Sequence, residues 1–280
     1  MVYKKYVQTF QQIRKQFGIS LAELSTIGIQ KSTLSNFERG KSMMTFDKVI
    51  LSLQYLGVSL EDFENFLNRY NSIDPLYLLD SVEEVIISNQ SEKLPELLRV
   101  SEQEGYKFIS LAIKSVLGEV SSQETEEIVD YLYRIDVWSY KELCIFYLVI
   151  ESLKSSDIIY LLRNFFKNNH DLFNSKKYQS YVGQLSCNAV VILSDRCFKD
   201  EAKEILDNIK GNDLANTMFV KTLLIGAEGY WTFLFSNKEK GREEMIKALN
   251  IIRLIDLKEV THYYEKKYEK IIHIQVLMHN

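Results

Sequence analysis

The chain is poor in the residues that interrupt helices, with only two prolines and 11 glycines among 280 residues. So few breakers over this length argue for an all-α protein. An uninterrupted apolar run of 18 residues is also missing, so the sequence predicts no segment that enters a membrane. The N-terminus lacks the apolar centre of a signal peptide, and we therefore expect a cytoplasmic protein.

Cysteine is scarce as well, and Cys144, Cys187 and Cys197 have no short paired spacing. This pattern favours reduced thiols over a disulfide framework or a metal site. The four histidines also lack the spacing of metal ligands. Because a Gly-rich phosphate loop and a nucleophile–base arrangement are absent too, we expect no metal, no cofactor and no enzyme.

Charge is unevenly distributed along the chain. Residues 1–48 carry eight Lys or Arg and three Asp or Glu, a net charge of +5, whereas the whole chain carries −4. The remainder must therefore carry −9. A basic segment joined to an acidic body is expected when one domain meets DNA phosphates and the other does not.

Residues 30–40 predict a short helix that ends at a left-handed Gly40. Leu34 and Phe37 lie three residues apart and form its apolar side. The opposite side combines short hydroxyls, an amide and two cations: Lys31, Ser32, Ser35, Asn36 and Arg39. These groups suit a helix in the DNA major groove, although a solvated helix face is the alternative.

The residues before this helix complete a helix-turn-helix pattern. Ser20 and Glu23 have the spacing of a capping box, which would start a preceding helix. Gly28 then breaks the chain just before the second helix. Helix, tight turn and helix with a polar outer face is the arrangement of many DNA-binding domains.

The sequences of these motifs resemble those of a known family. Ala22-Glu23-Leu24, Lys31-Ser32-Thr33-Leu34-Ser35 and Phe37-Glu38-Arg39-Gly40-Lys41 look like the Cro/repressor-type helix-turn-helix, and are closest to the Rgg/GadR/MutR transcriptional regulators. The resemblance implies that Lys31, Ser32 and Asn36 read bases. It assigns phosphate contacts to Ser20, Gln30, Ser35, Arg39 and Lys41. It also implies a buried pair between Arg14 and Glu38, the alternative being two solvated charges.

Helical spacing organises the rest of the chain. Residues 3–16 predict a first helix with an apolar stripe of Tyr6, Phe10, Ile13 and Phe17. Five helices complete a domain at residues 1–70, and a linker follows at 71–74. From 75 to 280 we expect an α-solenoid of helix hairpins, tetratricopeptide-like but without that consensus, because helix pairs recur roughly every 35–45 residues. The helices are predicted at 75–89, 94–104, 106–119, 122–135, 138–153, 155–170, 175–194, 198–209, 213–236, 239–254 and 257–277.

Stacked helix pairs leave a concave groove, and the family resemblance implies that it takes up a short, often hydrophobic, peptide. Asn188 interrupts an apolar stretch and is either a clamp for a peptide backbone or a satisfied core amide. Tyr181 and Gln184 lie on the same face of that helix. Arg163 and Asn164 interrupt another apolar run and either hold a peptide or face solvent. Tyr230 either lines the groove or packs in the core.

These observations predict a sequence-specific transcription regulator with double-stranded DNA and a short peptide as partners. One recognition helix reads too few base pairs for specificity, so we expect a homodimer on two half-sites. Two alternatives stay open at this point. The repeats could form a protein-interaction scaffold, or the regulator could bind DNA without taking a peptide.

Overall fold

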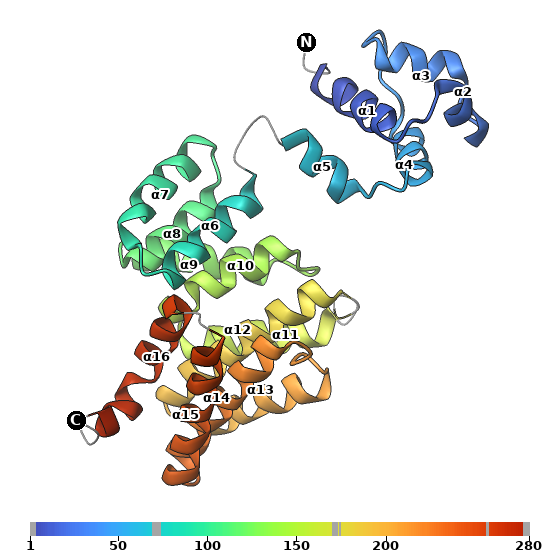
Figure 1. Cartoon of the computed structure of the whole chain (residues 1–280). Coiled ribbons are helices and arrows are strands. Elements are labelled where there is room, and N and C mark those ends of the chain that lie inside the picture. Colours follow the sequence, from blue (N-terminus) through green and yellow to red (C-terminus); the bar gives the residue numbers. More distant parts are fainter. Residues whose placement is uncertain (1–3, 69–73, 170–172, 174, 256–257, 277–280) are drawn as a thin grey trace. The chain divides into compact units, whose positions relative to one another are not determined.

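The computed structural model describes the chain except residues 1–3, 69–73, 170–172, 174, 256–257 and 277–280 (Figure 1). It divides into two compact units, Met1–Asp74 and Pro75–Asn280, called here the N-terminal and C-terminal units. The predicted linker falls at this division, and its residues 71–73 lie outside the described residues. Every regular element among the described residues is helical, so the predicted all-α class is confirmed.

The N-terminal unit is a cluster of short helices around one apolar core. Its elements are α1 (Lys4–Gln16), α2 (Leu21–Leu24), the 3₁₀ turn η1 (Ser25–Ile27), α3 (Lys31–Glu38), α4 (Phe46–Tyr55) and α5 (Leu60–Asn68). Phe10, Leu24, Leu34, Phe37 and Leu53 are almost completely buried in its centre. The core thus receives side chains from the first four helices, while Phe63 of α5 closes it.

The predicted apolar stripe of α1 is partly wrong. Phe10 and Ile13 are buried, but Tyr6 is 43% and Phe17 is 51% exposed. The buried face instead runs through Val7 and Arg14. Since α1 ends at Gln16, Phe17 lies beyond the helix and does not continue the stripe.

The C-terminal unit is a succession of antiparallel helix pairs, as the hairpin spacing predicts (Figure 1). Its elements are α6 (Pro75–Ile87), η2 (Ser91–Lys93), α7 (Leu94–Gln103), α8 (Lys107–Leu117), α9 (Ser122–Tyr133), α10 (Tyr140–Val149), η3 (Ile150–Ser152), α11 (Ser155–Asn168), α12 (Lys176–Asp195), α13 (Lys199–Gly211), α14 (Met218–Phe235), α15 (Lys238–Leu254) and α16 (Lys258–Val276).

These helices form two rows. The helices α6, α8, α10, α12 and α14 contact one another in succession and make one layer. Their hairpin partners pack outside it, with α13 against α12 and α15 against α14. The last helix, α16, contacts α15 and also α6, so it connects the end of the stack with its beginning. This return across the inner layer creates the pocket described below.

One predicted helix starts later than expected. The sequence predicts a helix from residue 213, but α14 begins at Met218, where the Thr217 hydroxyl accepts a hydrogen bond from the Val220 amide. Asp213 has a φ of 49°, and a right-handed helix cannot include a residue with a positive φ. Leu214 and Ala215 are buried in this connection, so apolar residues there belong to a packed loop.

Candidate functional site

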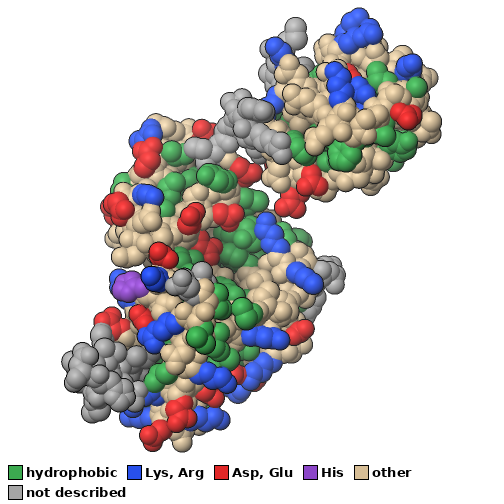
Figure 2. Space-filling view, viewed as in Figure 1, with side chains coloured by type: hydrophobic (Ala, Val, Ile, Leu, Met, Phe, Trp, Pro, Cys, Tyr) green, Lys and Arg blue, Asp and Glu red, His purple; other side chains and the backbone are tan. Residues whose placement is uncertain are grey.

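The helix α3, predicted from the sequence to enter the major groove, presents a polar face to solvent. Gly28 adopts a φ of 89°, which turns the chain between η1 and α3 at little steric cost. Leu34 and Phe37 are buried. The side chains on the other side are exposed or, for Ser35, half-buried: Lys31, Ser32, Ser35, Asn36 and Arg39. Lys and Arg side chains are visible on the surface of this unit in Figure 2.

A buried ion pair fixes α3 on α1. The Arg14 guanidinium donates from Nε to Glu38 Oε1 at 2.6 Å and from Nη2 to Oε2 at 2.8 Å. Its Nη1 donates to the Ile19 carbonyl at 2.5 Å. The hydrogen bonds from Glu38 raise the pKa of Arg14 above its usual value. The pairing expected from the sequence is therefore confirmed, and the phenyl rings of Phe10 and Phe37 pack edge-on beside it, 5.2 Å apart.

The flanks of α3 follow the predicted local chemistry. The Ser20 hydroxyl accepts from the Glu23 amide while the Glu23 carboxylate accepts from the Ser20 amide, which confirms the capping box. Gly40 has a φ of 67° and ends the helix. Ser20, Gln30 and Lys41 are exposed. All eight residues predicted to contact DNA thus lie on the surface of one small unit.

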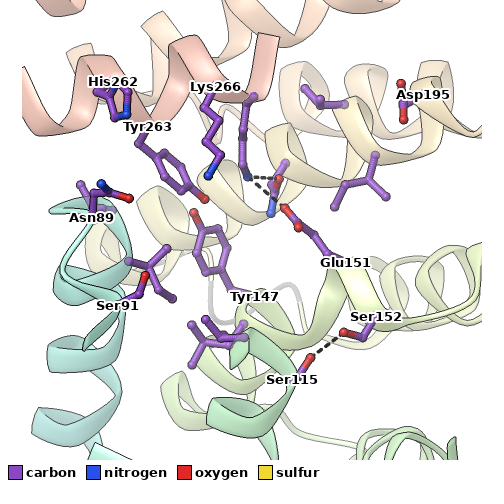
Figure 3. A pocket seen from close by; sticks show the side chains of 18 of the residues that line it. Asn89, Ser91, Ser115, Tyr147, Glu151, Ser152, Asp195, His262, Tyr263 and Lys266 are labelled. Atoms are coloured by element: carbon purple, nitrogen blue, oxygen red, sulfur yellow. Dashed lines mark hydrogen bonds and ion pairs between the residues drawn. The ribbon is translucent and has the colours of Figure 1, made fainter. Parts of the chain in front are cut away.

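A pocket of about 660 Å³ lies in the C-terminal unit, on the inner row of helices (Figure 3). The lining residues belong to α6, α8, α10, α12, α14 and α16, to η2 and η3, or to the positions just after α6 and α12. The lining residues are Ile86, Ile87, Asn89, Ser91, Ser115, Val116, Tyr147, Leu148, Glu151, Ser152, Asn188, Val191, Ile192, Asp195, Arg196, Tyr230, His262, Tyr263, Lys266 and Lys267. The pocket therefore combines an aliphatic wall with a polar rim.

Polar contacts cross the pocket from α16. Lys267 donates from Nζ to Asn188 Oδ1 at 2.5 Å and lies 3.7 Å from a Glu151 carboxylate oxygen. Tyr147 and Tyr263 point toward each other from α10 and α16 (Figure 3). Burial raises the pKa of Tyr263 to about 12 and that of Tyr147 further. Both phenols therefore stay neutral and can donate and accept hydrogen bonds at neutral pH.

Two charged groups of the rim, Arg196 and Asp195, are already paired. Arg196 donates to the carbonyl oxygens of Leu153 and Glu151 at 2.6 and 2.7 Å. The Tyr230 hydroxyl donates to Asp195 at 3.0 Å. Arg196 therefore holds η3 in place rather than facing the pocket as a free cation.

The structure separates the residues predicted to bind a peptide into three places. Asn188 and Tyr230 line the pocket. Tyr181 and Gln184 lie beside it and donate to the Glu83 carboxylate at 3.1 and 2.7 Å. Because the Tyr181 ring lies 5.8 Å from that of Tyr147, this second cluster adjoins the pocket.

Arg163 and Asn164 lie elsewhere, on the exposed side of α11. Arg163 forms an ion pair with Glu204 of α13, and Asn164 accepts a hydrogen bond from Asn168 at 2.7 Å. Neither lines the pocket, so the structure does not bring them together with Asn188. Sequence reasoning missed Tyr147, Tyr263, Lys266 and Lys267. The only local signal was the unusual density of Tyr and Lys in residues 262–268.

Two of the three cysteines lie in the core of the C-terminal unit, and the third, Cys197, is exposed. Cys144 and Cys187 are buried and free, and burial raises the pKa of the Cys144 thiol to about 12. A cluster of three potential metal ligands does not occur in the described part of the chain. Within the same residues, no helix has the length and apolar character needed to cross a membrane.

Two protein families match this chain, one in each unit. Residues 84–266 match the family described as "HTH-type transcriptional regulator Rgg, C-terminal domain", and residues 10–63 match the one described as "Helix-turn-helix". The crystal structure of the Streptococcus dysgalactiae SHP pheromone receptor Rgg2 is similar, at 22% sequence identity. The match covers 95% of this chain and 99% of that one, with a TM-score of 0.77.

Two further structures share the fold at lower identity. A bacterial peptide pheromone/receptor complex is 12% identical over 95% of this chain and 98% of its own, with a TM-score of 0.69. ComR from S. thermophilus, solved with DNA and its signalling peptide ComS, is 13% identical over 96% of this chain and 99% of its own, with a TM-score of 0.57. The family that matches is one of transcriptional regulators rather than of enzymes.

Proposed function

Because the chain belongs to the Rgg family of helix-turn-helix transcriptional regulators, we propose that it is a cytoplasmic, sequence-specific DNA-binding regulator controlled by a short hydrophobic peptide. Residues 1–70 bind DNA, and residues 75–280 bind the peptide and form the homodimer. The exposed polar face of α3 is the observation that carries this proposal.

The proposed DNA contacts follow from side-chain chemistry. Lys31, Ser32 and Asn36 are exposed on α3 and carry the donors and acceptors that discriminate base edges in the major groove. Ser20, Gln30, Ser35, Arg39 and Lys41 surround them and hold phosphates, which fixes the register of the helix on the duplex. The buried Arg14–Glu38 pair supports this role, because it fixes the orientation of α3 relative to α1.

The proposed peptide site is the pocket of the C-terminal unit. Its volume falls within the range of about 300–1,000 Å³ that is usual for ligand pockets. Ile86, Val116, Leu148 and Val191 offer apolar surface for peptide side chains. Asn188 offers an amide for the peptide backbone once Lys267 releases it. Rgg2 is named a pheromone receptor and ComR was solved with a signalling peptide, which supports this reading by analogy.

A dimer connects the two sites. Two half-sites on a palindromic operator require two recognition helices at a fixed spacing. A peptide that binds one arrangement of the C-terminal units more tightly than another shifts the population of DNA-competent dimers.

Selection from a pool of random double-stranded DNA tests the proposal. The wild type is compared with a Lys31→Ala/Asn36→Ala variant and with a control, Lys240→Ala/Asn250→Ala, which removes the same residue types from the exposed face of α15. We expect the wild type and the control to enrich one two-fold-symmetric site that the α3 variant does not enrich. Circular dichroism verifies that all three are folded. Absence of any enriched site, with and without peptide pools, would refute the proposal.

A further inference from the structure

Two lysines of α16 line the pocket, Lys266 at an exposed position and Lys267 at a largely buried one. The Lys267 side chain is only 14% exposed, so its charge is largely removed from water. A buried ammonium needs acceptors for its three N–H groups. One group is used by Asn188 at 2.5 Å, and the Tyr263 ring lies 4.9 Å from Nζ on another side.

The carboxylate nearest to Lys267 is a weak partner. Glu151 lies 3.7 Å away, beyond a normal hydrogen bond, and its side chain is 69% exposed. An exposed carboxylate at this distance is well solvated and contributes little to holding a cation. The charge of Lys267 therefore lacks a close anionic partner in the described structure.

Lys266 adds a second cation to the same rim. Its side chain points into the pocket (Figure 3) and makes neither an ion pair nor a hydrogen bond with any other described residue. Arg196 is committed to two backbone carbonyls, and Asp195 accepts from Tyr230. Lys266 and Lys267 are thus the cations of the rim that remain available to a ligand.

We propose that Lys266 and Lys267 make the pocket selective for peptides that carry a carboxylate, which the two ammonium groups bind while the aliphatic wall takes neighbouring apolar side chains. This inference rests on the proposed peptide-binding function and specifies in addition that the peptide carries a negative charge. A carboxylate between the two lysines provides the acceptors that Lys267 lacks and releases Asn188 to bind the peptide backbone. The carboxylate is either the C-terminus of the peptide or an Asp or Glu side chain.

Three pools of random octapeptides with free amino termini test this selectivity and distinguish the two sources. The first pool contains uncharged residues and ends in a free carboxylate, and the second contains the same residues and ends in an amide. The third pool ends in an amide but includes Asp and Glu. Each is incubated with the full chain, and retained peptides are counted by mass spectrometry after gel filtration.

We expect the wild type to retain the first or the third pool about tenfold more than the second, a factor equivalent to one charge-assisted hydrogen bond. The first pool identifies a terminal carboxylate and the third a side-chain carboxylate. In Lys266→Gln/Lys267→Gln, whose amides keep donors but lose the charge, the preference disappears. Lys258→Gln removes the same charge from an exposed position at the start of α16 and leaves the preference unchanged. Lys266→Gln alone breaks no contact within the described structure and is expected to lower the preference. It serves as the test if the double variant does not fold.

Equal retention of all three pools by the wild type would overturn the inference and leave peptide binding intact. A preference that survives in both lysine variants would overturn it as well. Retention of none of the pools would contradict the proposed peptide-sensing function itself, and the inference with it.

Discussion

The Arg14 guanidinium and the Glu38 carboxylate form two hydrogen bonds, of 2.6 and 2.8 Å, between α1 and the C-terminal end of α3. Both side chains are more than nine-tenths buried. The orientation of the recognition helix therefore depends on a charge pair inside the N-terminal unit and not on the DNA.

Glu38→Gln should destabilise the N-terminal unit by about 3–5 kcal/mol, because it leaves the buried Arg14 charge without its partner. Glu96→Gln is the matched control, since its pair with Arg99 is more than half exposed and its loss should cost far less stability. Urea unfolding of the full chain, followed by circular dichroism, measures both. Equal effects of the two substitutions would show that burial of the Arg14–Glu38 pair adds nothing to stability.

Arg39→Ala and Lys41→Ala should weaken binding to operator and random DNA alike. Each removes one phosphate contact, so the slope of log affinity against log salt should become shallower by about one for each. Fluorescence anisotropy at several salt concentrations measures these slopes. Lys154→Ala, an exposed lysine before α11, should leave the slope as in the wild type. An unchanged slope in the first two variants would remove these residues from the DNA interface.

The N-terminal unit could be predicted in detail because its signals are local. The Ser20–Glu23 capping box spans three residues, and Gly28 and Gly40 mark the ends of α3 through their own backbone angles. The exposed face of α3 follows from helical spacing alone. Tyr6 and Phe17 were placed wrongly because spacing does not reveal which face of α1 the helices α3 and α5 cover.

The pocket could not be predicted in the same way, because it depends on contacts between residues far apart in the sequence. Lys267 and Asn188 are 79 residues apart, and they meet only because α16 returns across the inner row to α6. Arg163 shows the converse difficulty. Its interruption of an apolar run looks the same whether the side chain faces a groove or pairs with Glu204 at the surface.

The stability of Glu83→Gln relative to the wild type should increase as the pH rises. Burial is the main cause that raises the pKa of Glu83 above its usual 4.5, and the hydrogen bonds from Gln184 and Tyr181 oppose this shift. Protonated Glu83 therefore favours folding below pH 4.5, and this contribution is lost as the pH rises through the raised pKa.

Thermal unfolding between pH 4.5 and about pH 8 measures this effect. The difference in Tm between Glu83→Gln and the wild type should grow toward high pH. Glu84→Gln, at the exposed neighbouring position, should show no such trend. A constant difference across the range would mean that Glu83 ionises as freely in the folded chain as in water.

Gly241→Ala should destabilise the C-terminal unit by about 1–3 kcal/mol. A Cβ atom at Gly241 would lie 2.5 Å from the Gly229 carbonyl oxygen and also clash with the backbone of Phe233, so α14 and α15 would have to separate. Gly211→Ala is the control, because a Cβ there meets nothing within 4 Å. Thermal unfolding should show a lower Tm for Gly241→Ala only. An equal Tm for the two variants would contradict the close approach of these helices.

The most direct test of the account is the affinity of the chain for its selected DNA site, measured with and without a peptide recovered from the octapeptide pools. The account predicts that the peptide changes the affinity for the site by about 5- to 150-fold, the usual range of coupling between linked sites, and that the DNA site changes the affinity for the peptide by the same factor. Lys31→Ala/Asn36→Ala should still bind the peptide while losing the site. A peptide that binds tightly but leaves the affinity for the site unchanged would contradict the account, because the pocket and α3 would then act independently.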